Sequence, residues 1–136
     1  MSSILSIAAS GLAAATQRLQ VSAENVANAS SDGPLPSASA AVQAQFPPAY
    51  NAQQVTQVAT AGGGTQAVVS NVQPGTVTAY DPTAPFADAN GNVAAPNVDY
   101  GSEIVAQLLA SYEYAANAGV LGVASQMLAT VLDIEV

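Results

Sequence analysis

The sequence lacks histidine, cysteine, tryptophan and lysine, and Arg18 is its only basic residue. Most acid–base and nucleophilic catalysis uses His, Cys, Lys or carboxylates whose pKa values are tuned by neighbouring charges. Nine carboxylates remain here, with a single cation to pair with them. Ser-His-Asp and Cys-His sites, and metal sites built on His or Cys, are therefore excluded. We predict that the protein is not an enzyme and uses no cofactor.

The shortage of positive charge also limits the partners. The formal net charge is −8, whereas binding to a nucleic-acid backbone requires several Lys or Arg side chains. Anionic membrane surfaces attract basic segments in the same way, so we expect neither partner. The absence of cysteine fits a reducing cytoplasm and a secreted protein without disulfides equally well.

Charge of either sign is scarce, because only 7% of the residues are charged while 50% are hydrophobic. A soluble monomer usually carries about a quarter charged residues. Much of this surface is therefore expected to lie against other molecules.

Two uncharged stretches bear on membrane insertion. Residues 1–17 lack the basic segment of a signal peptide, and their apolar residues have helical spacing. Residues 114–132 are about long enough to span a bilayer, but they include Asn117 and Gln126 and have no flanking Lys or Arg. We predict neither a cleaved signal peptide nor a membrane-spanning segment.

The chain divides into three parts by composition: 1–29, 30–100 and 101–136. The middle part holds all eight prolines, and the two outer parts have helical periodicity. The predicted fold is mainly α with a small β module, in which paired, coiled-coil-like N- and C-terminal helices flank a β-hairpin region and assemble into a helical tube.

The N-terminal helix has one regular apolar stripe. Its members are spaced by alternating threes and fours, as in a heptad repeat, and they are Leu5, Ala8, Leu12, Ala15, Leu19, Ser22 and Val26. Ser2 or Ser3 is expected to cap the helix, and Asn28 to end it. Packing of an amphipathic helix on its own domain explains the stripe equally well.

The C-terminal helix has two apolar rows. The first comprises Val105, Leu109, Tyr112, Ala116, Gly119, Val123, Met127, Thr130 and Ile134, and the second comprises Leu108, Leu121, Ala124, Leu128 and Leu132. One partner helix covers a single row, so the other faces need neighbours from other subunits. Asp99 or Ser102 is the expected N-cap.

We predict that the N-terminal stripe packs against the first row of the C-terminal helix, with Gly119 allowing close approach. The predicted assembly interface consists of Leu5, Leu12, Leu19, Val26, Leu109, Tyr112, Gly119, Val123, Met127 and Ile134.

Between the helices, the pattern predicts a hairpin module of three or four short strands, three of them at 54–60, 67–72 and 76–80. Gly62–Gly64, Pro74-Gly75 and Asn90-Gly91 supply turn signals. Residues 30–50 are expected to form an extended or poorly structured connector.

Three motifs in this region partly match known ligand-binding or catalytic sites. The Asp88–Asn92 segment offers alternating oxygen ligands for calcium, but Val93 stands where an EF-hand loop needs glycine. No Gly-Lys-Ser/Thr follows the three glycines, and an Asp81–Asp88 carboxylate pair lacks a cleft with aromatic residues. We therefore predict turns here and no metal site.

Two signatures resemble one family. Ser10-Gly11-Leu12 followed by Asn25-Val-Ala-Asn28 resembles the N-terminal signature of flagellar rod, hook and related axial proteins. The run from Tyr80-Asp81-Pro82 through Asp88, Gly91 and Val93 to Pro96-Asn97-Val98 resembles the linker of the proximal rod protein C subfamily. Glu103, Tyr114, Asn117 and Met127–Ile134 resemble the closing helix of that family. These segments cover both ends and about half of the chain.

The resemblance implies a structural subunit of the proximal rod in the bacterial cell envelope. Such a subunit self-associates with other axial rod and hook-type subunits, transmits torque, and leaves the cell through the flagellar type III export apparatus without a cleaved signal.

The chain departs from the family after Asn28, where a Thr-Pro-x-Tyr segment and an arginine-rich strand give way to an uncharged Ser/Ala/Gln/Pro stretch. A homopolymeric extracellular filament, or a small secreted binding or adhesion module that uses the 52–98 hairpins, therefore remains an alternative.

Overall fold

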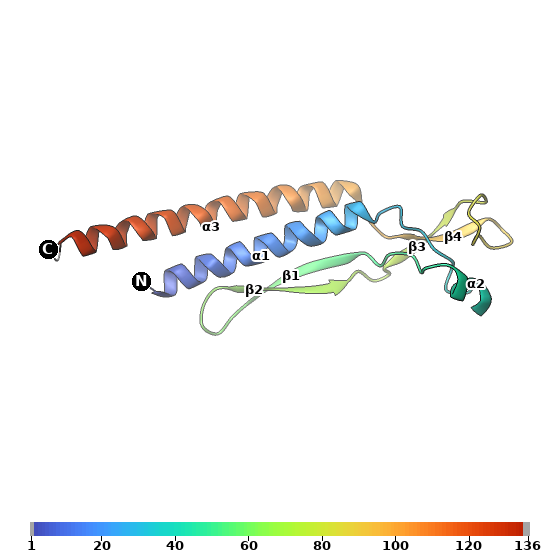
Figure 1. The fold of residues 1–136 in the computed structure, drawn as a ribbon, viewed down its shortest axis with the longest axis horizontal. Helices are drawn as coiled ribbons and strands as arrows, with labels where there is room; N and C mark the ends of the chain where they lie inside the picture. Colours follow the sequence, from blue (N-terminus) through green and yellow to red (C-terminus); the bar gives the residue numbers. More distant parts are fainter. Residues whose placement is uncertain (1, 135–136) are drawn as a thin grey trace.

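The structure is a computed structural model that describes residues 2–134, with side chains described for residues 4–131. The molecule is elongated (Figure 1). Helices α1 (Ser2–Ala27) and α3 (Tyr100–Ile134) run antiparallel, so both chain ends lie at the same end of the molecule. The predicted pairing of the N- and C-terminal helices is confirmed.

Local side chains fix where the long helices end and begin. The Asn28 side chain donates to the Glu24 carbonyl at 2.9 Å and so satisfies an acceptor in the last turn of α1, which ends at Ala27. At the start of α3, the Asp99 carboxylate accepts from the Gly101 N–H at 2.9 Å. Asp99 is therefore the N-cap, while Ser102 lies inside the helix. Ser2 and Ser3 have side chains outside the described residues.

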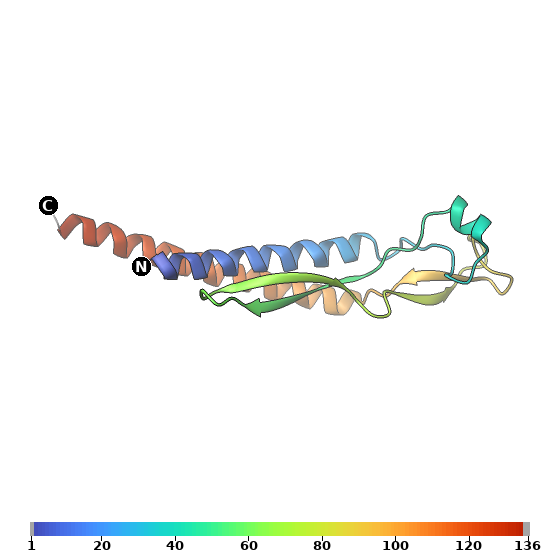
Figure 2. The same ribbon diagram turned by 90° about the horizontal axis from the view of Figure 1, so that it is seen from below.

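A hairpin of β1 (Gln53–Ala59) and β2 (Thr65–Asn71) lies along α1 (Figures 1 and 2). The strands pair antiparallel from Gln53↔Asn71 to Ala59↔Thr65. Gly63 and Gly64 have φ values of +83° and +92°, a conformation that side chains disfavour, so the glycine run allows the turn. The two strands were predicted to within two residues.

A second, separate sheet contains β3 (Thr76–Tyr80) and β4 (Asn92–Pro96), at the far end from the chain termini. Its turn closes at Gly91, which has φ +78°. Val93 and Ala94 are buried in this sheet. The Pro74-Gly75 pair does not join β2 to β3 in a hairpin, as the turn signal suggested, but separates the two sheets.

The connector at 30–50 is more ordered than the sequence suggested. It contains α2 (Ala40–Gln45), whose N-cap Ser39 accepts from the Val42 N–H. Phe46 packs on Phe86 with ring centroids 5.5 Å apart. The connector was expected to be extended or poorly structured, and α2 is neither, because apolar residues of this stretch find partners around the β3–β4 sheet.

Within residues 2–134, none of the helices combines the length and apolarity that crossing a lipid bilayer demands.

Candidate assembly surface

The contact between α1 and α3 is built from small side chains. Ala8 and Ala15 on α1 and Ala110 on α3 are almost fully buried. Alanine lets two helices approach closely, because little side-chain volume separates the backbones. On α3 the residues turned toward α1 are half-buried or buried and follow heptad spacing; they are Glu103, Ala106, Ala110, Glu113, Asn117, Leu121, Ala124 and Leu128.

This face is not the row chosen from the sequence. Leu109, Tyr112, Val123 and Met127 have exposed fractions of 50%, 66%, 57% and 59%. The prediction that Leu109 and Tyr112 pack on the N-terminal stripe within one chain is wrong. Val123 and Met127 lie beside Leu5 of that stripe, but they line an open groove and are not buried against it. The face that does pack carries fewer large apolar residues. Its Glu103 and Glu113 side chains bond to Asn25 and Arg18 of α1, and Asn117 lies against Gly11.

The other residues of the predicted assembly interface lie mostly on α1. On α1, Leu5, Leu12 and Val26 are half-buried while Leu19 is exposed. The side chain of Ile134 lies outside the described residues.

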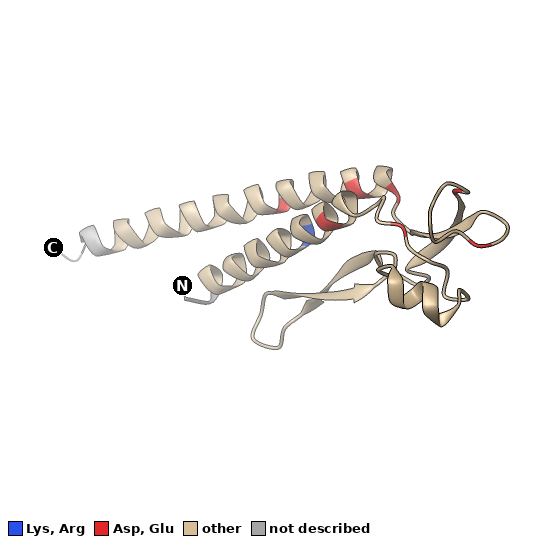
Figure 3. Cartoon of the chain, turned by 45° about the vertical axis from the view of Figure 1, so that its right-hand side comes forward, with Lys and Arg blue, Asp and Glu red and all other residues tan. Residues whose placement is uncertain are grey.

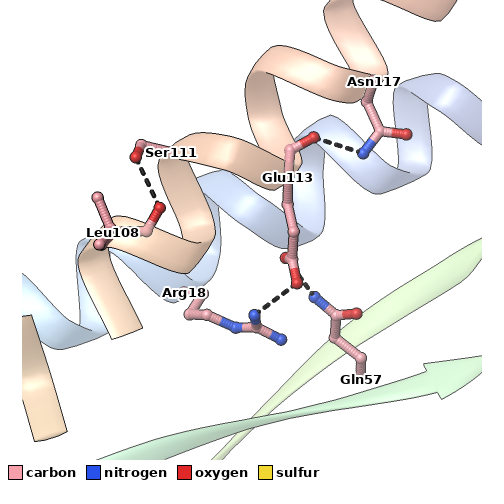
Figure 4. Close-up of polar contacts among 6 residues, drawn as sticks. All are labelled: Arg18, Gln57, Leu108, Ser111, Glu113 and Asn117. Carbon is pink, nitrogen blue, oxygen red and sulfur yellow. Dashed lines mark hydrogen bonds and ion pairs between the residues drawn. The ribbon is translucent and has the colours of Figure 1, made fainter. Parts of the chain in front are cut away.

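The glycine that permits close approach is Gly11, not Gly119. A Cβ atom at Gly11 would lie 2.5 Å from the Asn117 Oδ1, whereas one at Gly119 would meet nothing within 4 Å. The Asn117 side chain is held by a 2.8 Å hydrogen bond from its Nδ2 to the Glu113 carbonyl (Figure 4). Gly11 belongs to the Ser-Gly-Leu signature, so the structure gives that motif a packing role.

One ion pair connects three elements. The Arg18 guanidinium donates to the Glu113 carboxylate at 2.8 Å, and the Gln57 side chain of β1 donates to the other carboxylate oxygen at 3.3 Å (Figure 4). The side chains of Arg18 and Glu113 are 22% and 40% exposed. A pair this open to water contributes about 0–1 kcal/mol. It orients the hairpin and α3 around α1 more than it stabilises them.

Asn25, near the end of α1, is the centre of a buried hydrogen-bond network. Its Nδ2 donates to the Gln53 carbonyl and to the Glu103 carboxylate, each at 2.7 Å. Its Oδ1 accepts from the Gln53 N–H at 2.9 Å and from the Tyr50 hydroxyl at 3.0 Å. We call these four residues the Asn25 junction.

The burial of Asn25 and the raised pKa of Tyr50 agree with these hydrogen bonds. The Asn25 side chain is 1% exposed. Burial, with further contributions from the nearby Glu24 and Glu103 carboxylates, raises the pKa of Tyr50, which keeps its hydroxyl a donor. Periodicity and spacing gave no sign of this network. Asn25 and Glu103 stood out only as members of the family signatures.

At the opposite end, the two helices diverge and leave an open apolar groove of about 450 Å³. It is lined by Ile4 and Leu5 of α1 and by residues of α3 from Ala116 to Leu128. Four of the ten predicted assembly residues meet here: Leu5, Gly119, Val123 and Met127.

Among the residues whose side chains are described, none at this end of the molecule is charged (Figure 3). No acidic or basic residue occurs before Arg18 or between Glu113 and Asp133. The exposed large apolar residues of α3 include Ile104, Val105, Leu108, Leu109, Tyr112, Val120, Val123, Met127 and Val131. An exposed apolar surface of this extent on one element is typical of a protein–protein contact.

The acidic loops have structural roles. The Asp88 carboxylate accepts from the Asn92 and Asn90 N–H groups, each at 2.8 Å, and these bonds lower its pKa. Bonds from Thr83 lower the pKa of Asp81 in the same way. Among the described residues, no group of three acidic side chains is arranged to hold a metal ion.

No protein-family model matches the chain. Individual relatives do match it over nearly its whole length. The flagellar basal-body rod protein FlgC of Salmonella typhimurium is 40% identical over 126 residues, which cover 92% of this chain and 90% of that protein.

Relatives from other bacteria agree. The protein of the same name from Escherichia coli O6:H1 is 38% identical over 126 residues, with the same coverage. That of Agrobacterium fabrum is 31% identical over 140 residues, covering 98% of this chain and 94% of the relative. The resemblance seen in the sequence motifs is confirmed, and the chain belongs to the flagellar basal-body rod protein FlgC family.

Proposed function

We propose that the chain is a structural subunit of the proximal rod, and that it self-assembles with other axial subunits into the tube that transmits torque. The observation that carries this proposal is the exposed, uncharged apolar surface of α3 in a member of a rod protein family. The location that follows is the flagellar basal body in the bacterial cell envelope.

Apolar burial is the expected driving force for assembly. Each Å² of apolar surface removed from water contributes about 25 cal/mol. Most of α3 beyond Ala110 is only half-covered or exposed in the single chain. Neighbouring subunits would cover Leu109 and Tyr112 from outside. The groove lined by Leu5, Gly119, Val123 and Met127 would accept a neighbour between the helices.

Export through the flagellar type III apparatus, without a cleaved signal, is part of the same proposal. Within residues 2–17, α1 is continuous helix and carries no basic residue. An amphipathic helical start agrees with a segment that is retained and used in assembly.

The test is incorporation into basal bodies. A flagellated strain that lacks its own FlgC-type protein is made to express this chain, and its basal bodies are isolated and probed by immunoblotting and electron microscopy. We expect the chain in the rod fraction and completed rods. Basal bodies without the chain, in cells that contain and export it, would overturn the proposal.

The same purified protein tests the alternatives. Regular tubes formed by this chain alone, with no incorporation into basal bodies, would favour the homopolymeric filament. A stable monomer that binds cell surfaces would favour the adhesion module. The relatives described above are all named rod proteins, which gives adhesion no support.

A further inference from the structure

The chain crosses repeatedly between the two ends of the molecule. The element order alternates between the helix pair with its hairpin and the far end with α2 and the β3–β4 sheet, so the chain crosses between them four times (Figure 1). Among the described elements, β3 and β4 make no backbone contact with α1, α3 or the β1–β2 hairpin. The position of the far end therefore depends on the crossing segments.

Backbone hydrogen bonds join these segments to one another. The Tyr50 N–H donates to the Ser31 carbonyl at 3.0 Å. The Gly75 carbonyl accepts from the Ala52 N–H at 3.3 Å and from the Asn97 N–H at 3.0 Å. These bonds hold the crossing segments together, but none of them reaches α1 or α3.

The Asn25 junction supplies that connection. Asn25 belongs to α1, Tyr50 to the connector, Gln53 to the start of β1, and Glu103 to the first turn of α3. The Asn25 side-chain amide therefore uses both its N–H donors and its acceptor oxygen to bond residues of three other segments. The Ser22 hydroxyl adds a 3.0 Å bond to the Glu103 carbonyl from the previous turn of α1.

We propose that Asn25 is a positioning residue that fixes the far end, with its β3–β4 sheet, relative to the helix pair. An amide is suited to this role because it offers two donors and an acceptor in one plane, whereas a carboxylate only accepts and a hydroxyl has one donor. If the chain is a rod subunit, the junction couples its helices to its outer part under load. That consequence rests on the proposed function, but the positioning itself does not.

The test uses the full-length monomer with spin labels. Because the sequence has no cysteine, Ser111→Cys on α3 and Asn90→Cys in the far loop place two unique labels, and both residues are exposed. Pulsed electron spin resonance then gives the distribution of label distances. We expect one narrow distance distribution in the parent protein and a broad one after Asn25→Ala. The helix content, measured by circular dichroism, should be the same in both.

Asn28→Ala is the matched control. Asn28 lies one turn further along, and its side chain bonds only locally: it donates to the Glu24 carbonyl and accepts from the Ser31 hydroxyl three residues on. It reaches neither β1 nor α3, so its loss should leave the distribution narrow. Should Asn25→Ala reduce the helix content, Tyr50→Phe removes only the bond to Oδ1 and should still broaden the distribution. A narrow distribution in every folded variant, or equal broadening after Asn28→Ala, would overturn the proposal.

A polarity exchange separates positioning from general stability. Asn25→Asp places a carboxylate against Glu103 and should broaden the distribution. Adding Glu103→Gln to this variant supplies an amide donor to the new carboxylate at position 25 and should narrow the distance distribution again. If the second change only destabilised the fold, the distribution would broaden further, and this result would contradict the proposal. These measurements need no assembly, so their failure is distinct from failure to enter the rod.

Discussion

The two ends of the helix pair are held together by different physical means. Near the start of α3, the Asn25 junction and the Arg18–Glu113 pair connect α1, α3 and the hairpin through directed bonds of 2.7–3.3 Å. Toward the chain termini, Leu5, Val123 and Met127 line an open apolar groove, and none of the described residues that line it is charged. At the first end, the polar side chains find their bonding partners within the same chain.

The difference indicates which end is complete in a single subunit. Polar groups must be paired inside one chain, because an unpaired buried polar group is costly. No buried side-chain nitrogen or oxygen among the described residues lacks a partner. Apolar groups bind without such directionality, so the uncharged end can leave its surface open for another copy.

A charge in the groove should have the largest effect on assembly. Val123→Asp places a carboxylate on a surface that we expect to be buried between subunits, and an uncompensated buried charge costs about 3–5 kcal/mol. Assembly should be lost while the monomer keeps its thermal midpoint, because Val123 is exposed in the single chain. Sedimentation velocity measures assembly.

Asn90→Asp is the control, since it adds the same charge in an exposed loop at the far end. Normal assembly of Val123→Asp, or equal loss in both variants, would remove the groove from the proposed interface.

Two glycines distinguish contacts within the chain from contacts between chains. Gly11→Val forces a side chain against Asn117, and overpacking of this kind lowers the free energy of unfolding by about 1–3 kcal/mol. A Cβ atom at Gly119 meets nothing within 4 Å, so we expect Gly119→Val to keep monomer stability while it weakens assembly. Chemical denaturation and sedimentation measure the two effects. A destabilised Gly119→Val monomer would contradict this assignment.

Added salt should promote assembly moderately. Eight net negative charges per subunit repel one another when copies stack, and ions screen this repulsion over about 8–10 Å. The acidic residues whose side chains are described lie away from the groove, so the effect should be smaller than that of Val123→Asp. Light scattering between low and moderate salt follows it. Assemblies that dissolve as salt rises would mean that attraction between charges holds them.

Loss of the Asp99 cap should have the smallest effect. Hydrogen bonds from Ser102 and Gly101 lower the pKa of Asp99 below its usual value. The ionised carboxylate therefore stabilises the fold above the unfolded pKa of about 3.9, and this contribution is lost as pH falls through the lower, folded pKa. Asp99→Ala should lower the thermal midpoint slightly at pH 7, and its difference from the parent should vanish in strong acid. A difference that persists there would exclude this linkage.

Local patterns in the sequence determined much of the fold. The two proline-free segments predicted the long helices, and Asn28 and Asp99 were recognised at their ends because capping depends on adjacent residues. The strands β1, β2 and β3 followed from alternation and from turn residues, for which Gly63, Gly64 and Gly91 give the conformational reason. The lack of histidine, cysteine and lysine removed most catalytic chemistry without any structure.

Only the tertiary structure decided which row of α3 faces α1. Two apolar rows followed helical spacing, but the face that packs is a third one, which shares only its C-terminal part with the second row. That face is set by polar partners far away in the chain: Arg18 for Glu113 and Asn25 for Glu103. Periodicity reports which residues share a helix face, but not which face a distant segment will cover. For that reason Gly11 rather than Gly119 became the point of close approach, and the Asn25 junction, joining residues up to 78 positions apart, was visible only once the chain had folded.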